Sequence, residues 1–180
     1  SLNADVTSTN GNVSVRAAQA LSFAADADVR TASTAAGNGH IDLEAGTGAI
    51  TMNASSVLLS TGATAAARLL AGTSVTVGDI SVASGAVSIT AGSSILDADP
   101  VTTTNDTDPD ITASALRLNA GMGIADSVNH LETTVGTLSA RAGNGGIFLL
   151  EADALSVDDV GLSVNRVGSA AAVSTVSDAA

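Results

Sequence analysis

An Ala-Gly pair recurs along this chain, each time at the end of a stretch in which apolar and polar residues alternate. The stretches read IDLEAG (41–46), RLLAG (68–72), VSITAG (87–92), LRLNAG (116–121) and LSARAG (138–143), and VSVRAA (13–18) is a weaker relative. Their alanines stand at positions 17, 45, 71, 91, 120 and 142. Alternation with a period of two residues predicts β-strands. A repeat of 20–30 residues is typical of architectures built from stacked units.

The residues after each Ala-Gly pair also repeat. A short turn of small residues leads into a second apolar-polar stretch, as in AGTGAITM (45–52) and AGMGIAD (120–126). A third element reads VGDISV (77–82) and VDDVGL (157–162), each with an Asp corner between apolar residues. One unit is therefore predicted to be strand, turn, strand, corner and strand.

A single unit of this kind cannot bury its apolar side, because an isolated pair of short strands is marginally stable in water. Stacked units bury it. The chain is 45% hydrophobic but only 1% aromatic, which favours a slender core of small aliphatic residues. The interior is expected to contain Val13, Val15, Ile41, Leu43, Leu69, Val87, Ile89, Leu116, Leu118 and Leu138.

These patterns predict an all-β fold over residues 1–180, a parallel β-helix (β-solenoid) of about 6–7 coils with 20–30 residues each. The chain is expected to be one solenoid segment of a much longer repetitive protein. An antiparallel sandwich is the alternative, because the Ala-Gly turns can also be interpreted as hairpins.

One segment, DADPVTTTNDTDPDITA (97–113), interrupts the repeat. It holds both prolines of the chain and five of its aspartates. A polar segment with prolines predicts an acidic loop insertion at one corner.

The charge balance excludes several partners. The chain has 18 acidic and 6 basic residues, a formal net charge of −12. Phosphates of nucleic acids and anionic membrane surfaces would be repelled. No apolar run is long enough to span a bilayer, no signal peptide is visible, and the absence of cysteine excludes disulfides.

The repeat resembles those of filamentous-haemagglutinin-like and other giant repetitive adhesins and matrix proteins of Gram-negative bacteria. The best-matching stretch runs from Leu116 to Val164 and begins LRLNAGMGIADSV. The resemblance implies a β-helical, secreted protein that serves adhesion, biofilm cohesion or filament formation. The secretion domain, a C-terminal secretion signal and an adhesive head of that family are not recognisable in this chain.

RLNAGMGIADS (117–127) invites comparison with a glycine-rich dinucleotide-binding turn, because Gly121 and Gly123 precede an acid at Asp126. Such a turn needs a helix after it. Gly136 and β-branched residues stand where that helix would run, and four other repeats carry an equivalent turn. We therefore predict a structural turn.

Paired acids are the candidates for a carbohydrate-acting enzyme of the β-helix type, a polysaccharide lyase or hydrolase. Asp42 with Glu44, or Asp158 with Asp159, would supply the two carboxyl groups of a glycosidase. The chain has no Trp or Tyr to stack a sugar ring, and its six arginines are scattered. Solvated acids on outer strand positions are the preferred interpretation, and no catalytic residue is predicted.

The acidic loop suggests one possible metal site, for Ca²⁺, which prefers oxygen ligands. Its ligands would be Asp97, Asp99, Asp106, Asp108 and Asp110. The loop lacks the glycine and glutamate of the helix-loop-helix calcium signature, so a solvated loop without a metal is the favoured alternative. His40 and His130 have no second His or Cys nearby in sequence and are predicted to bind no metal.

Together these observations predict a structural stalk or fibre segment, and not an enzyme, of an extracellular or cell-surface bacterial adhesin, biofilm-matrix or filament-forming protein. The expected partners are neighbouring repeats of the same chain or like subunits stacked end to end, with surface glycans or host cell surfaces as binding targets. Nucleic acid, membrane insertion and cofactors are not expected.

Overall fold

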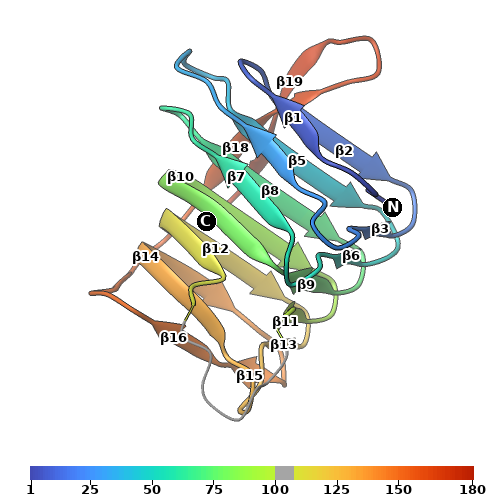
Figure 1. Ribbon diagram of the computed structural model, residues 1–180. Coiled ribbons are helices and arrows are strands. Elements are labelled where there is room, and N and C mark those ends of the chain that lie inside the picture. Colours follow the sequence, from blue (N-terminus) through green and yellow to red (C-terminus); the bar gives the residue numbers. More distant parts are fainter. Residues whose placement is uncertain (100–107) are drawn as a thin grey trace.

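The computed structural model describes residues 1–99 and 108–180, and all regular structure in this part of the chain is β (Figure 1). Most strands belong to an 11-stranded sheet, the large sheet. Its strands are β1 (Val6–Ser8), β2 (Val13–Ala17), β4 (Val29–Thr31), β5 (His40–Ala45), β7 (Val57–Ser60), β8 (Ala66–Ala71), β10 (Asp79–Ala91), β12 (Ile111–Ala120), β14 (Leu131–Arg141), β16 (Leu149–Glu151) and β17 (Ser156–Val157).

Six short strands form a second sheet, the small sheet. They are β3 (Leu21–Ser22), β6 (Ile50–Thr51), β9 (Val75–Val77), β11 (Ile95–Asp97), β13 (Gly123–Ile124) and β15 (Gly146–Ile147). All pairings in both sheets are parallel. Residues after β17 form an antiparallel hairpin of β18 (Leu162–Val167) and β19 (Val173–Asp178).

The repeated alanine sets the register of the large sheet. Ala17, Ala45, Ala71, Ala91 and Ala120 lie opposite one another on β2, β5, β8, β10 and β12. Equivalent positions of the repeat therefore pair directly. Because side chains alternate between the two faces of a strand, this register places every repeat's apolar residues on the same face.

The core lies between the two sheets and consists of rows of aliphatic residues. One row crosses the large sheet through Val13, Ile41, Ala67, Val87, Leu116, Leu138 and Val157. Another crosses the small sheet through Leu21, Ile50, Val75, Ile95, Ile124 and Ile147. The inner members of both rows are fully buried.

The glycines of the Ala-Gly pairs are needed because the turns lie very close together. A Cβ on Gly92 would lie 2.2 Å from the carbonyl oxygen of Gly72, and a Cβ on Gly121 would lie 2.2 Å from that of Gly92. The Gly121 amide donates to the Ala91 carbonyl at 3.0 Å. A residue with a side chain cannot approach this closely. These glycines form the glycine row of Gly46, Gly72, Gly92, Gly121 and Gly143.

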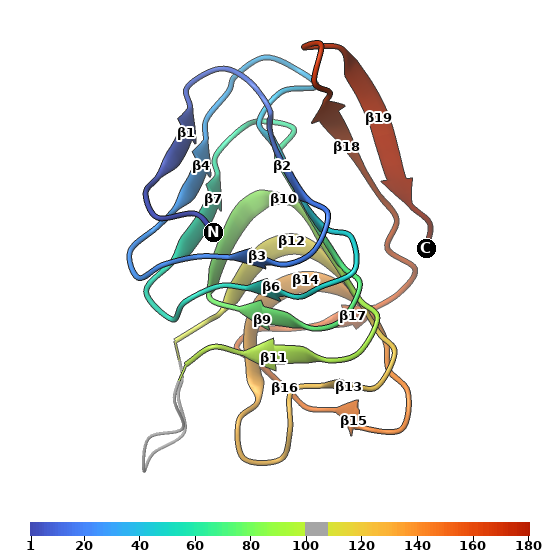
Figure 2. The same cartoon turned by 90° about the vertical axis from the view of Figure 1, so that its right-hand side faces the viewer.

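The prediction of a β-solenoid of six or seven similar coils over residues 1–180 is wrong. Strands β10, β12 and β14 have 13, 10 and 11 residues and continue through the position at which a coil needs a corner. They join the short strands on both sides into one sheet. Figure 2 shows this large sheet bending over the small one. The fold is therefore all-β, with two parallel sheets in layers and an antiparallel hairpin.

The loop insertion predicted at 97–113 is too long at both ends, because described residues at each end of this range belong to strands. Asp97 belongs to β11, and Ile111 begins β12 with its side chain fully buried. Ala113 is also part of the core. Residues 100–107 lie outside the described part of the chain.

The hairpin packs on the outer face of the large sheet, beside β2, β5, β8 and β10 (Figure 2). Leu162 and Val164 form a small apolar cluster with Ala66, separate from the main core. The chain thus returns from β17 toward the strands at which it began.

Candidate functional site

A network of ion pairs connects the hairpin with the large sheet. Asp42 on β5 lies opposite Arg68 on β8, and Arg68 Nη1 is 3.0 Å from Asp42 Oδ1. From the hairpin, Arg166 Nε contacts Asp42 Oδ2 at 2.5 Å and Arg166 Nη2 contacts Glu44 Oε2 at 2.5 Å. Asp178 Oδ1 is 2.9 Å from Arg68 Nε. We call these five residues the hairpin network.

The hairpin network is largely removed from solvent. The Asp42 side chain is fully buried, and those of Arg68 and Arg166 are 6% and 15% exposed. Burial alone would raise the pKa of Glu44, but hydrogen bonds from Arg16 and Arg166 outweigh it and lower that pKa. The hydrogen bond to Asp42 raises the pKa of Arg166. Each charged side chain of the hairpin network therefore contacts a side chain of opposite charge. Buried charges need such partners, because removing a charge from water is costly.

Hydrogen bonds between uncharged groups also attach the hairpin to the large sheet. His40 Nδ1 accepts the Asn165 amide at 2.6 Å, and His40 Nε2 lies 2.9 Å from the Thr64 carbonyl oxygen. Burial lowers the pKa of His40, with the Thr64 carbonyl acting in the opposite direction. An imidazole that accepts at Nδ1 and donates at Nε2 is the neutral form. His40 thus holds the hairpin.

The two alternative carboxylate pairs of the sequence analysis lie in different surroundings. Asp42 and Glu44 are engaged by arginines, whereas Asp158 and Asp159 are exposed at the far end of the same sheet. Asp158 follows β17, five strand steps from Asp42, or about 24 Å at the usual strand spacing.

A second cluster of charged residues contains Asp97, Asp110 and Glu132, and we call it the carboxylate cluster. One carboxylate oxygen from each lies within 4.8 Å of the others. Asp110 and Glu132 are buried, with 2% and 6% of their surface exposed. The cluster forms because β11 ends at Asp97, β12 begins just after Asp110, and Glu132 is the second residue of β14.

Hydrogen bonds fix the carboxylate cluster. The Glu132 amide donates to Asp110 Oδ2 at 2.7 Å, and Asn129 Nδ2 donates to Asp97 Oδ2 at 2.7 Å. Burial raises the pKa of Asp110 to about 9, and the negative charges of Asp97 and Glu132 act in the same direction. Asp110 therefore carries a proton at neutral pH, which removes one charge from the buried group.

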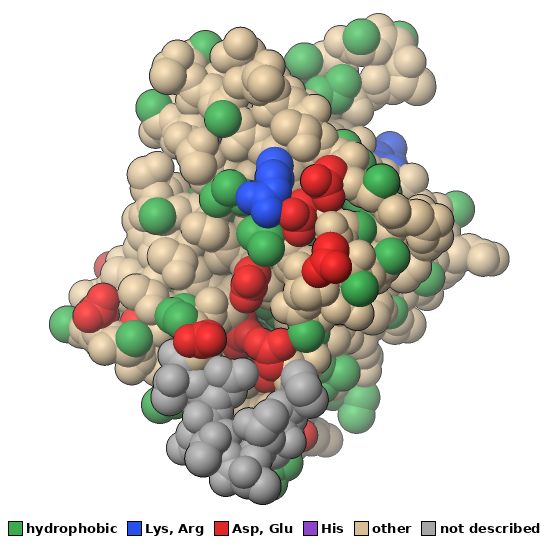
Figure 3. Space-filling model, in the orientation of Figure 1, with side chains coloured by type: hydrophobic (Ala, Val, Ile, Leu, Met, Phe, Trp, Pro, Cys, Tyr) green, Lys and Arg blue, Asp and Glu red, His purple; other side chains and the backbone are tan. Residues whose placement is uncertain are grey.

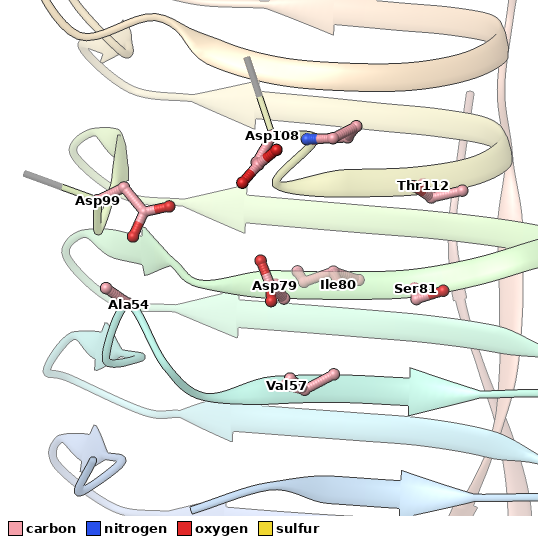
Figure 4. A pocket seen from close by; sticks show the side chains of 9 residues that line it. Ala54, Val57, Asp79, Ile80, Ser81, Asp99, Asp108 and Thr112 are labelled. Carbon is pink, nitrogen blue, oxygen red and sulfur yellow. The ribbon is translucent and has the colours of Figure 1, made fainter. Parts of the chain in front are cut away.

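The structure brings together only part of the predicted calcium ligand set. Asp97 and Asp110 meet, with Glu132 as a member that the sequence prediction missed. Asp99 and Asp108 line a neighbouring open pocket of about 470 Å³ together with Asp79 (Figure 4). Asp106 lies outside the described residues.

Acidic side chains gather on this face of the molecule (Figure 3). Carboxylate oxygens are suitable Ca²⁺ ligands. The proton on Asp110 removes one of the three charges of the carboxylate cluster, and hydrogen bonds engage Asp97 and Asp110. Calcium binding stays a prediction.

The glycine-rich segment at 121–126 contains a turn and a strand. Gly121 and Met122 follow β12 directly, and β13 begins at Gly123, so no helix begins there. Gly121 is a member of the glycine row. The other histidine, His130, lies edge-on to Phe148, with ring centroids 6.2 Å apart.

The chain matches no protein-family model, no curated protein and no solved structure in the three comparisons. Within the described residues, no helix has the length and apolar character needed to cross a membrane. The resemblance to bacterial adhesins rests on the repeat alone.

Proposed function

We propose that this chain is a structural segment of a secreted or cell-surface bacterial adhesin or matrix protein, in which it gives length and stiffness. The observation that supports this function best is the unbroken series of parallel strands from β2 to β17. Each added strand lengthens the body by about 4.8 Å and hydrogen bonds to its neighbour. Stability accumulates between neighbours in such arrays.

The charged residues support the same function. Asp42 and Glu44, which would be the acids of an enzyme, bind arginines that hold the hairpin on the sheet. The net charge of −12 favours solubility and keeps copies apart at low ionic strength. No specific geometry of the described residues favours a carbohydrate-acting enzyme as a second candidate.

The experiment is made in the bacterium that encodes the chain. Antibodies raised against residues 1–180 are applied to intact and to permeabilised cells, and cohesion is measured after in-frame deletion of the segment. We expect labelling of intact cells and weaker cell–cell cohesion in the deletion strain. Labelling that requires permeabilisation, or unchanged cohesion with labelled cells, would contradict the proposed function.

A turnover assay of the purified chain on acidic and neutral polysaccharides complements this experiment. We expect no product. Turnover that is abolished by Asp42→Asn and not by Asp158→Asn, in variants shown to be folded, would replace the structural function with an enzymatic one.

A further inference from the structure

The apolar rows of both sheets end on exposed residues at the same end of the molecule. Val157 ends the row of the large sheet and is 80% exposed, although the member before it, Leu138, is 7% exposed. Ile147 ends the row of the small sheet and is 44% exposed, although Ile124 before it is fully buried. Both side chains continue the core without a further layer over them in the described residues.

None of the residues that the structure describes, 1–99 and 108–180, covers this end. Strand β17 pairs with β14 on one side only, and the residues after it leave toward the hairpin. The hairpin packs beside β2, β5, β8 and β10, several strands away. An edge strand with free backbone groups and an exposed apolar residue is a site for pairing with a further strand.

The opposite end of the molecule presents strands that fit this edge. Strands β1 and β16 are the two outermost strands of one series of paired strands in the large sheet. Strands β2 and β17 are the outermost strands of the other series. All of these strands run in the same direction. A second copy that is shifted along the stack and keeps the same strand direction therefore continues both series of strands with parallel pairing.

We propose that two copies of the chain associate head to tail, with β1 and β2 of one copy pairing with β16 and β17 of the other. Val13 then covers Val157, and Thr7 lies opposite Ala152. This proposal rests on the proposed structural function and extends it. A heterologous contact that does not close into a ring produces a filament.

The polar end of a third row limits the strength of this contact. That row runs through Val6, Val29, Leu58, Ile80, Ile111, Thr133 and Glu151. The Glu151 carboxylate accepts hydrogen bonds from Thr133 Oγ1 at 2.9 Å and from the Val135 amide at 3.0 Å. Inward charges at an edge oppose uncontrolled pairing. Since each copy has a charge of −12, we expect association to strengthen with ionic strength.

Disulfide trapping tests the register of the proposed contact. The chain has no cysteine, and Thr7 and Ala152 are both exposed. Cα atoms on adjacent strands lie about 4.8 Å apart, within the range of a disulfide. A mixture of Thr7→Cys and Ala152→Cys chains under mild oxidation should form mixed dimers. Neither variant alone should form more dimer than Leu96→Cys, an exposed position on β11 in the middle of the small sheet.

Sedimentation velocity over a range of protein concentration and salt gives the second readout. Val157→Asp should weaken association roughly tenfold or more, because it places a charge in the contact. Leu96→Asp, at an exposed position on β11 in the middle of the small sheet, is the control and should leave association unchanged. Val157 is so exposed that its substitution should not prevent folding, and circular dichroism verifies this.

A monomer at every concentration and salt, disulfides between two Ala152→Cys chains, or equal effects of the two aspartate variants would overturn the proposed contact. None of these results would change the surface labelling or the cell cohesion expected from the proposed function. A failure of the contact is therefore distinguishable from a failure of the proposed function.

Discussion

The fold alters the protonation of Asp110. Its pKa is raised to about 9, whereas an unfolded aspartate has a pKa of 3.8. The folded state therefore binds one more proton than the unfolded state between about pH 4 and about pH 9. This contribution to stability is complete below the unfolded pKa and is lost as the pH rises through the folded pKa.

Asp110→Asn should remove this dependence on pH. An asparagine carbonyl still accepts the Glu132 amide, and its NH₂ group takes the place of the proton toward Asp97. We expect the variant to gain stability relative to the wild type as the pH rises from 5 to 9, measured by urea unfolding. Asp159→Asn, an exposed acid outside the cluster, controls for the change in net charge. Parallel pH profiles of Asp110→Asn and wild type would contradict the assigned proton.

Some of these contacts follow from the sequence and others do not. Asp42 and Arg68 both stand three residues before the alanine of their repeats. Alignment of the repeats therefore places opposite charges on adjacent strands, as the structure has them. Glu132 lies near Asp97 only because the end of β11 and the starts of β12 and β14 lie close together. No spacing in the sequence reveals that proximity.

At the scale of strands and turns, the glycine row fixes how closely the units stack. Gly92→Ala places a Cβ 2.2 Å from the Gly72 carbonyl oxygen, so the backbone must move. We expect a loss of about 1–3 kcal/mol in the free energy of unfolding, the usual cost of overpacking. Gly161→Ala is the control, because its nearest neighbouring atom is 3.5 Å from the added Cβ. Equal stability of both variants would show that the turns can separate freely.

The hairpin is an element that should open independently of the sheets. Arg166→Ala removes the contacts with Asp42 and Glu44. We expect faster hydrogen exchange of the amides of β18 and β19, while those of β10 and β12 keep their protection. Arg16→Ala, with a side chain that is 57% exposed, should change little. Faster exchange in β10 and β12 as well would mean that the hairpin and the sheets unfold as one unit.

The sequence pattern predicts the strands better than their assembly. The alternation identifies β2, β5, β8, β12 and the second half of β10, and the alanines give their register. It cannot show that β10, β12 and β14 continue past a corner, because alternation is the same in a straight and in a bent strand. The other repeats have no equivalent of the hairpin, and its contacts with Asp42 and Arg68 join residues more than 100 positions apart.

For the whole molecule, the proposed function assigns the charged residues to the maintenance of the architecture. Asp42 is the clearest case, because it is fully buried between Arg68 and Arg166. Removing one partner of a buried ion pair costs about 3–5 kcal/mol. A carboxylate kept for catalysis behaves differently, since active-site groups are often retained at a cost in stability.

Urea unfolding of Asp42→Asn therefore tests the structural role of this residue. We expect the free energy of unfolding to fall by about 3–5 kcal/mol, while Asp158→Asn, on the exposed far end of the sheet, changes it by less than about 0.5 kcal/mol. An Asp42→Asn variant as stable as the wild type, or more stable, would contradict this structural role.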